Sequence, residues 1–340
     1  MKRIHSIDAL KLFFAYIIAF YHFGWELSPG PVITVQLFFV FSGFFLAKKF
    51  YSKSHADGGE HYSAWCYTLD HAKSIYPIYL FSILAYFGFH MLRSGVDLLR
   101  SPSLDKLSAM ALSLYDQIPD LTFLQSSYRF HESLNYPLWQ VSALLIAGHF
   151  VYALLCHNEK LSRTLLFPGA ILLIQCLLYY GEADLWGNWG PFYVPLLRAF
   201  SPLCIGVLTY LFTATPQYET LKKHRLLFDL ATLYGFAALF LYGDRNNLFL
   251  LSAALMVLNC WDEASFLNKL LNRPIFRNAG TLSLSIYVNH ALIARILEAR
   301  LSHSGMSPLI QNTLYATALT LWSLLSLFLV EKVQNHNSHS

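Results

Sequence analysis

The sequence predicts an all-α polytopic membrane protein with about ten transmembrane helices and one outer amphipathic helix. Hydrophobic residues make up 55% of the 340-residue chain, and charged residues only 13%. Soluble domains have about 25% charged residues. Apolar segments long enough to cross a hydrocarbon core of about 30 Å recur along the whole chain. We therefore expect one transmembrane domain over residues 1–332, followed by a short polar tail over residues 333–340.

Ten apolar segments have the length and composition of transmembrane helices. In chain order they cover residues 7–23, 31–50, 75–92, 136–155, 165–180, 192–212, 226–242, 248–261, 282–297 and 313–330. The eighth segment is the shortest of the ten. An even number of spans places both termini on the same side of the membrane.

The distribution of Lys and Arg predicts which side that is, because cytoplasmic loops are enriched in these residues. The short loops around Glu26 and over residues 182–190 carry none, and we place them outside. No cleavable signal peptide is expected, since Lys11 and His22 interrupt the first apolar segment. The chain is thus expected in the plasma (inner) membrane with both termini in the cytoplasm. This orientation puts 15 of the 24 basic residues inside: Lys2, Arg3, Lys48, Lys49, Lys53, Lys73, Lys160, Arg163, Lys222, Lys223, Arg225, Lys269, Arg273, Arg277 and Lys332.

One outward segment, residues 93–135, is much longer than the other loops. Apolar residues recur in it at helical spacing, with polar residues on the other side. The apolar positions are Leu104, Leu107, Ala111, Leu114 and Tyr115. This pattern predicts an amphipathic helix on the outer surface of the membrane. A loop helix packed on the bundle is an equally good interpretation.

Cysteine spacing and net charge exclude several classes of site. The five cysteines are Cys66, Cys156, Cys176, Cys204 and Cys260. No pair has the spacing of a metal or redox motif, so we expect neither a metal site nor a disulfide framework. The net charge of +4 is accounted for by the inward loops. It therefore does not indicate a nucleic-acid partner.

Lys11 and His22 are ionisable groups inside the first apolar segment, where such groups usually face a cavity, a partner or a substrate path. Eleven residues of helix advance about 16 Å and turn only about 20° beyond three full turns. The two side chains therefore lie on one face. Other interpretations remain: Lys11 reaching the interface or pairing with Asp8, and His22 as a structural histidine.

Six short motifs follow one another from the first predicted span to the ninth. They are IDALK at 7–11, YHF at 21–23, FFVFSGF at 38–44, IYPIY at 75–79, NYPLW at 135–139 and LSIYVNH at 284–290. In this order they resemble the acyltransferase-3 family of integral-membrane acyltransferases. The most specific parts are the histidine eleven residues after a cation and the Phe-Phe-x-x-Ser-Gly-Phe run.

The resemblance implies a ten-helix domain that takes an acyl group, usually acetyl, from acyl-coenzyme A in the cytoplasm. The group passes to a hydroxyl of a carbohydrate or another envelope molecule. The catalytic histidine of the family corresponds to His22, and its usual Arg to Lys11. The chain is a divergent member by this comparison: residues 71–74 (HAKS) stand where members carry Arg-x-x-Arg, and Ala143 stands where they carry Glu.

Acyl transfer from a thioester to an alcohol needs a base for the hydroxyl proton or a nucleophile that briefly carries the acyl group. Histidine can do either near neutral pH, and both routes stay open here. Acyl-coenzyme A is the expected co-substrate, with its phosphates near Lys11 and its sulfur near His22. Further residues expected to bind it are Lys48, Lys49, Lys73, Ser42 and Tyr76. Ser42 and Gly43 are also explained as close-packing residues of the second helix.

Polar residues at membrane depth on later helices are expected to line the acceptor side. They are Trp139, Gln140, Ser142, Arg198, Asn289 and His290. Trp139 either stacks on a sugar or, like Trp186 and Trp189, marks the outer interface. The expected partners are the lipid bilayer and a carbohydrate or glycolipid acceptor.

Two other functions fit the same features. A transporter or flippase of a lipid-linked or acylated intermediate also needs a polar path through a helical bundle. A family member with weak catalysis, acting as a partner in polysaccharide export, is consistent with the departures at residues 71–74, at Lys11 and at Ala143.

Overall fold

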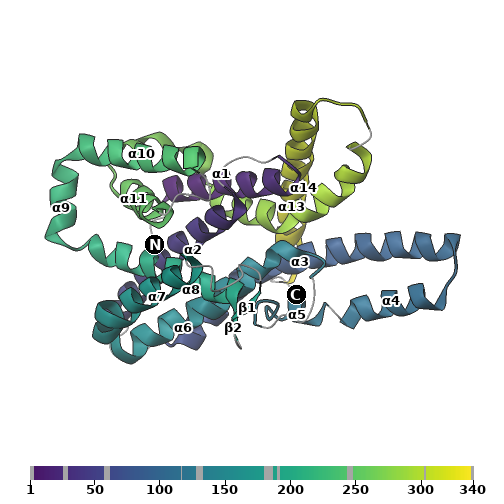
Figure 1. The fold of residues 1–340 in the computed structure, drawn as a ribbon, viewed down its shortest axis with the longest axis horizontal. Helices are drawn as coiled ribbons and strands as arrows, with labels where there is room; N and C mark the ends of the chain where they lie inside the picture. Colours follow the sequence, from purple (N-terminus) through teal and green to yellow (C-terminus); the bar gives the residue numbers. More distant parts are fainter. Residues whose placement is uncertain are drawn as a thin grey trace.

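The computed structural model describes residues 4–25, 30–56, 62–115, 117–127, 133–179, 187–189, 192–242, 248–301 and 304–337. Glu26, Trp186 and the last residues of the polar tail lie outside these ranges. Helices dominate the described chain (Figure 1). One short antiparallel ladder joins β1 (Asn188–Trp189) to β2 (Phe192–Tyr193).

The helices follow the order of the predicted segments. They are α1 (His5–His22), α2 (Pro31–Ala56), α3 (Ala64–Arg100), α4 (Leu104–Tyr115), α5 (Ile118–Leu121), η1 (Tyr136–Leu138), α6 (Trp139–Leu161), η2 (Ser162–Leu166), α7 (Phe167–Tyr179), α8 (Val194–Phe212), α9 (Pro216–Lys223), α10 (Arg225–Tyr242), α11 (Phe249–Trp261), α12 (Phe266–Leu271), η4 (Pro274–Phe276), α13 (Ala279–Leu301) and α14 (Pro308–Asn337). Each of the ten predicted segments overlaps one of them.

Two helix pairs form the centre of the molecule, α2 with α8 and α1 with α13. Glycines permit the first pair to approach closely. A Cβ atom on Gly43 would overlap the carbonyl group of Leu203, and one on Gly206 would overlap the carbonyl of Val40. Small residues serve this purpose in membrane helices generally. Gly43 is therefore a packing residue, one of the interpretations that the sequence allows.

The described part of the structure has fewer candidate membrane spans than the ten expected. Six described helical runs are long and apolar enough to cross a membrane: 33–53, 64–100, 136–178, 194–212, 225–242 and 308–335. The helices α1 and α13 carry ionisable residues such as Lys11 and Arg295, and α11 is only 13 residues long. Apart from the short β1–β2 ladder, the described chain is helical, and the protein is a multi-pass membrane protein with six candidate spans.

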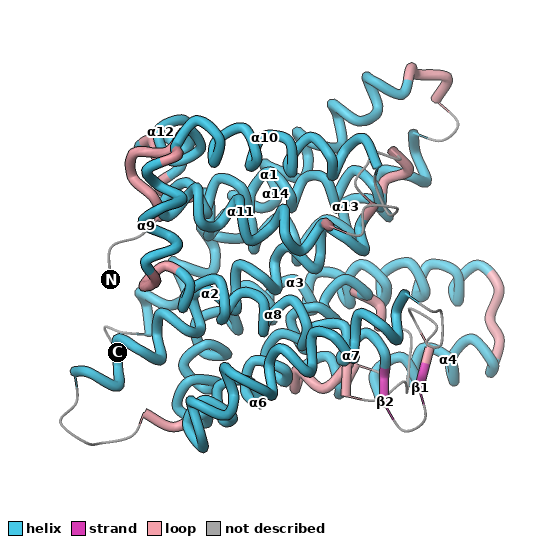
Figure 2. Tube along the Cα trace, turned by 60° about the vertical axis from the view of Figure 1, so that its left-hand side comes forward, coloured by secondary structure: helices cyan, strands magenta, loops and turns pink. Residues whose placement is uncertain are grey.

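The run over residues 136–178 contains two predicted segments and turns back on itself. Asn158 has non-helical backbone angles, with φ −155° and ψ 92°. The hydroxyl of Ser162 donates a hydrogen bond of 2.8 Å to the carbonyl of Leu154. Eight residues of straight helix would hold these positions about 12 Å apart. The chain therefore reverses here, and both α6 and α7 pack against α8 (Figure 2).

The described residues of the segment 93–135 form a hairpin over 93–115, followed by a short strap over 117–127 and 133–135. α3 continues to Arg100, eight residues beyond the predicted end of its span, and α4 runs back along it (Figure 1). The predicted amphipathic helix is thus present as α4. None of its residues is buried, and Leu104 is 83% exposed. The apolar side chains of α4 are therefore exposed on the surface of the hairpin.

Candidate active site

His22 is the last residue of α1 and lies against rings from two other parts of the chain. Its ring centroid is 5.2 Å from that of His290 on α13, with an angle of 22° between the planes. Tyr136 approaches the same ring at 73°, with the centroids 5.0 Å apart. Because α1 and α13 pack over much of their length, the core of the fold holds His22 in this position.

His290 is fully buried, and its hydrogen bonding assigns its tautomer. Nδ1 lies 2.6 Å from the carbonyl oxygen of Tyr287. Since a carbonyl oxygen only accepts, Nδ1 carries the hydrogen of the neutral ring and Nε2 carries the lone pair. Within the described residues, Nε2 has no hydrogen-bond partner. Buried acceptors left in this state are uncommon, and this one lies beside His22.

A cavity of about 550 Å³ adjoins His22, between α3 and α13. Its polar lining comes mainly from side chains that no motif of the sequence singles out. They are Tyr86, His90, Arg93, Asp97, Arg295 and Glu298. One sequence signal for Arg295 was available, because an ionisable residue within an apolar segment is itself an indication of function. The juxtaposition of Arg93 with Arg295 has no such signal.

Lysines expected to bind the cofactor gather toward the N-terminal end of α1, at the opposite end from His22. Lys11 Nζ is 4.9 Å from the centroid of the Phe45 ring, and Lys48 Nζ is 6.0 Å from the same centroid. His71, at the first position of the family's Arg pair, lies within electrostatic reach of Lys11 and Lys49. His71 therefore leaves a polar imidazole in this cluster where the family carries Arg.

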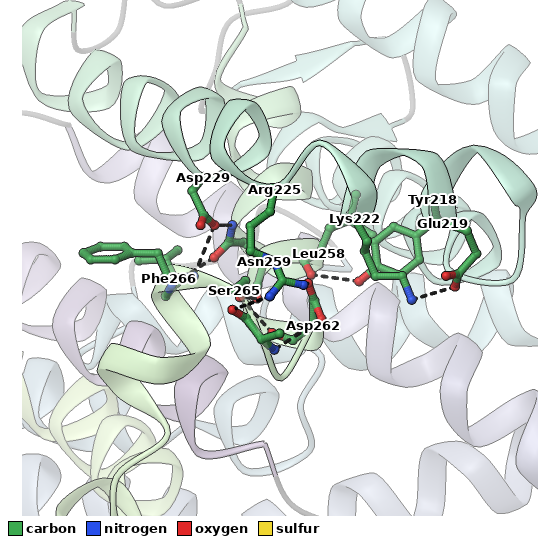
Figure 3. Close-up of polar contacts among 12 residues, drawn as sticks. Tyr218, Glu219, Lys222, Arg225, Asp229, Leu258, Asn259, Asp262, Ser265 and Phe266 are labelled. Atoms are coloured by element: carbon green, nitrogen blue, oxygen red, sulfur yellow. Dashed lines mark hydrogen bonds and ion pairs between the residues drawn. The ribbon is translucent and has the colours of Figure 1, made fainter.

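A polar network behind these lysines positions Trp261, and Lys48 Nζ lies 4.8 Å from the centroid of its ring. Arg225 of α10 donates a hydrogen bond of 3.2 Å to Asp262, the residue after Trp261 (Figure 3). This contact fixes the end of α11 against α10. Other members of the network are Tyr218, Asp229, Leu258, Asn259, Ser265 and Phe266.

The remaining residues expected to bind the cofactor have different contacts and different exposure. Lys49 forms an ion pair of 3.4 Å with Asp70, and the exposed Lys73 lies within electrostatic reach of the same carboxylate. Ser42 is one turn before Phe45 on α2 and is half-buried. Tyr76 is directed elsewhere: its hydroxyl donates to the carbonyl of Leu121 at 3.4 Å. It therefore contacts the strap after α4 and not the lysines.

Among the residues expected on the acceptor side, His290 is the one that contacts His22. Ser142 donates a 2.6 Å hydrogen bond to the carbonyl of Phe123 and anchors the strap to α6. Asn289 accepts a hydrogen bond of 3.0 Å from an indole N–H of α14, which ties α13 to that helix. Among the described residues, the lining of the cavity does not include Trp139, Gln140, Ser142, Arg198 or Asn289.

Three of these residues form a separate group on α6 and α8, in which Gln140 and Arg198 are buried and Trp139 is half-buried. The Arg198 guanidinium lies over the Trp139 ring, 6.0 Å from its centroid, and Arg198 is only 1% exposed. Gln140 donates a long hydrogen bond of 3.5 Å to the carbonyl of Val35. Ala143, at the family's Glu position, is fully buried among apolar residues. This group lies in the core between α2, α6 and α8.

The arrangement suits a transfer reaction that uses two sites at opposite ends of α1. α1 is continuous, so about 16 Å of helix separates the cationic end near Lys11 from the imidazole of His22. Cations bind phosphate, and an imidazole near neutral pH serves as base or nucleophile. In the described part of the chain, no group of three or more His, Cys, Asp or Glu side chains is placed to hold a metal.

The sequence was compared with known families, curated proteins and solved structures. Residues 4–332 match the model of the acyltransferase-3 family, which is described as an acyltransferase domain. No curated protein and no solved structure matches. The match extends from the start of α1 into α14, so it includes His22, Lys11 and the cavity. The chain belongs to the acyltransferase-3 family of membrane acyltransferases.

Proposed function

We propose that the protein is a membrane O-acyltransferase that moves an acyl group from cytoplasmic acyl-coenzyme A to a hydroxyl of an envelope carbohydrate or glycolipid. Acetyl is the expected acyl group. One observation carries this proposal. α1 joins a cluster of lysines at one end to His22 at the other, where a polar cavity adjoins the imidazole.

The lysine cluster supports a nucleotide-bearing donor. Lys11, Lys48 and Lys49 place three ammonium groups around aromatic side chains at one end of the bundle. Ammonium groups bind phosphate as point charges, without the fork geometry of Arg. The thioester end of such a donor then reaches His22 through the interior, past Ser42. Lys73 and His71 supply further positive or polar groups where the donor enters.

In the direct route, His22 takes the proton of the acceptor hydroxyl as its oxygen attacks the thioester carbonyl carbon. The new ester bond forms, the carbon–sulfur bond breaks, and the thiolate of coenzyme A leaves and takes the proton. In the two-step route, a nitrogen of His22 attacks the thioester carbonyl carbon and takes the acyl group as the thiolate of coenzyme A leaves. The acceptor oxygen then takes the acyl group from the imidazole, the nitrogen–carbon bond breaks, and the hydroxyl proton ends on the thiolate. His290 stacks on His22 in either case and restricts its orientation.

We assign the orientation from the chemistry of the two ends of α1. The lysine end faces the cytoplasm, where acyl-coenzyme A is made available, and the cavity and the α3–α4 hairpin face outside. The abundance of Lys and Arg in the corresponding loops supports this assignment. A Ser103→Cys variant should react with a membrane-impermeant maleimide added to intact cells. Protection of that thiol until the cells are opened would contradict the orientation.

The proposed function is tested by mass spectrometry of the cell-surface glycans. Cells that contain the wild type should carry an ester-linked acyl group that is missing from cells without the protein and from cells with His22→Ala. Glycans that are unchanged in composition but fewer at the surface would instead support the transporter alternative. Identical glycans in all three strains would contradict both.

A further inference from the structure

The cavity beside His22 contains more charged groups than a neutral sugar requires. Arg93 and Asp97 project from α3, and Arg295 and Glu298 project from α13. The two helices thus each contribute one guanidinium and one carboxylate to the same space. A neutral sugar presents only hydroxyls and ring oxygens, which uncharged donors and acceptors can bind without a guanidinium.

These charges are not paired with one another. The spacing of Arg93 to Asp97 and of Arg295 to Glu298 would permit an ion pair along each helix. The ion pairs within 4.0 Å that join described residues involve other side chains, such as Lys49 with Asp70 and Arg163 with Glu159. In the described part of the chain, both guanidinium groups are therefore available to a ligand in the cavity.

The two arginines provide donor groups suited to an anion. A guanidinium donates two parallel hydrogen bonds to a carboxylate or a phosphate, which makes Arg the preferred partner of these groups. The hydroxyl of Tyr86 lies within electrostatic reach of both Arg93 and Arg295 and can donate a further hydrogen bond. Asp97 and Glu298 accept hydrogen bonds only, so they suit the hydroxyls of the same ligand.

We propose that the acyl acceptor is an anionic carbohydrate whose carboxylate or phosphate is bound by Arg93 and Arg295 while one of its hydroxyls faces His22. This inference rests on the proposed function, because it concerns the acceptor of the same reaction. Tyr86 assists the two arginines, and the carboxylates of Asp97 and Glu298 orient the sugar ring. Neutral sugars of the same size are poor acceptors.

The test measures binding of three probes to the full-length, detergent-solubilised protein by saturation-transfer NMR. The probes are glucose, glucuronate and glucose 6-phosphate, which separate a neutral ring, a carboxylate and a phosphate. The wild type should bind at least one of the two anions about tenfold or more tightly than glucose, the scale of one charge-assisted contact. Arg93→Gln and Arg295→Gln should each weaken anion binding about tenfold. Arg93→Lys and Arg295→Lys keep the positive charge and should weaken it less.

Arg100→Gln and Arg300→Gln are the matched controls, since they remove a charge from the same helices outside the cavity. Both should bind the anions as the wild type does. Equal binding of all three probes, no binding of either anion, or equal losses in the cavity and control variants would overturn the inference. Titration of coenzyme A keeps the proposed function separate. Coenzyme A should bind the wild type and all variants with the same affinity, which would also show that the variants are folded. If coenzyme A did not bind the wild type, the proposed function itself would be refuted.

Discussion

The imidazole of His22 stacks on that of His290, with ring centroids 5.2 Å apart. These residues are 268 positions apart in the chain, and the packing of α1 on α13 brings them together. His290 is held by its own hydrogen bond to the Tyr287 carbonyl. It therefore gives His22 a rigid neighbour on the side of the core, while the charged cavity adjoins His22 as well.

Replacing His22 by Ala should abolish acyl transfer. Loss of a general base typically lowers a rate by 10²- to 10⁴-fold, and loss of a covalent nucleophile has at least that effect. The measurement is transfer of a labelled acetyl group from acetyl-coenzyme A by purified protein. His290→Phe, which keeps a ring against His22, is the comparison and should retain more activity. Residual activity of His22→Ala above about a tenth of the wild-type rate would remove His22 from the mechanism.

Replacing Lys11 by Ala should weaken coenzyme A binding by about 1.5–3 kcal/mol, or about 10- to 150-fold, the value of a hydrogen bond to a charged group. Lys11→Arg should bind as well as the wild type, and Lys11→Met tests the charge apart from the apolar stem. Calorimetric titration of coenzyme A and of 3′-dephospho-coenzyme A measures these differences. Lys223→Ala, on α9, is the control. Equal binding by all variants would show that Lys11 has a structural role.

Gly43→Ala should destabilise the protein by about 1–3 kcal/mol, the usual effect of overpacking a tight core. The added Cβ would overlap the carbonyl of Leu203 and force α2 and α8 apart. Gly88→Ala is the matched control, because nothing lies within 4 Å of its added Cβ. There, Ala should be neutral or slightly stabilising in a helix. Melting temperatures in detergent check both, and equal shifts would contradict the packing role of Gly43.

The buried carboxyl of Asp120, in the strap outside the spanning helices, should make stability depend on pH. Burial raises the pKa of Asp120 from 3.8 to about 6, and the hydrogen bond from Ser133 offsets this only in part. The folded protein keeps a proton that the unfolded chain releases. The free energy of unfolding therefore falls as pH rises from about 4 to about 6, by up to about 3 kcal/mol, and this contribution is constant above that range.

Asp120→Asn should remove this component, so that the variant gains stability relative to the wild type as pH rises through the same range. Melting temperatures of the detergent-solubilised proteins from pH 4 to pH 7 provide the measurement. Asp105→Asn, exposed on α4, removes a carboxylate without touching the buried site. Parallel pH profiles for wild type and Asp120→Asn would show that Asp120 is not the titrating group.

The sequence alone determined the features that depend on local periodicity and composition. Long apolar segments predicted the helices, because a helix satisfies its own backbone hydrogen bonds wherever it lies. The helical repeat placed Lys11 and His22 on one face of one helix. The motifs predicted the family, which the match over residues 4–332 shows. Each of these properties is carried within a single segment of chain.

Only the tertiary structure decided which segments meet. Six candidate spans stand against the ten expected, because α1 and α13 carry ionisable residues, α11 is short, and two predicted segments share one helical run that bends at Asn158. Ser142 and Asn289 are predicted to bind the acceptor, and the tertiary structure shows that each also makes a hydrogen bond that joins parts of the fold. Arg93 and Arg295 share a cavity because α3 and α13 pack together. Contacts between distant segments depend on how complete helix surfaces fit, which no single segment encodes.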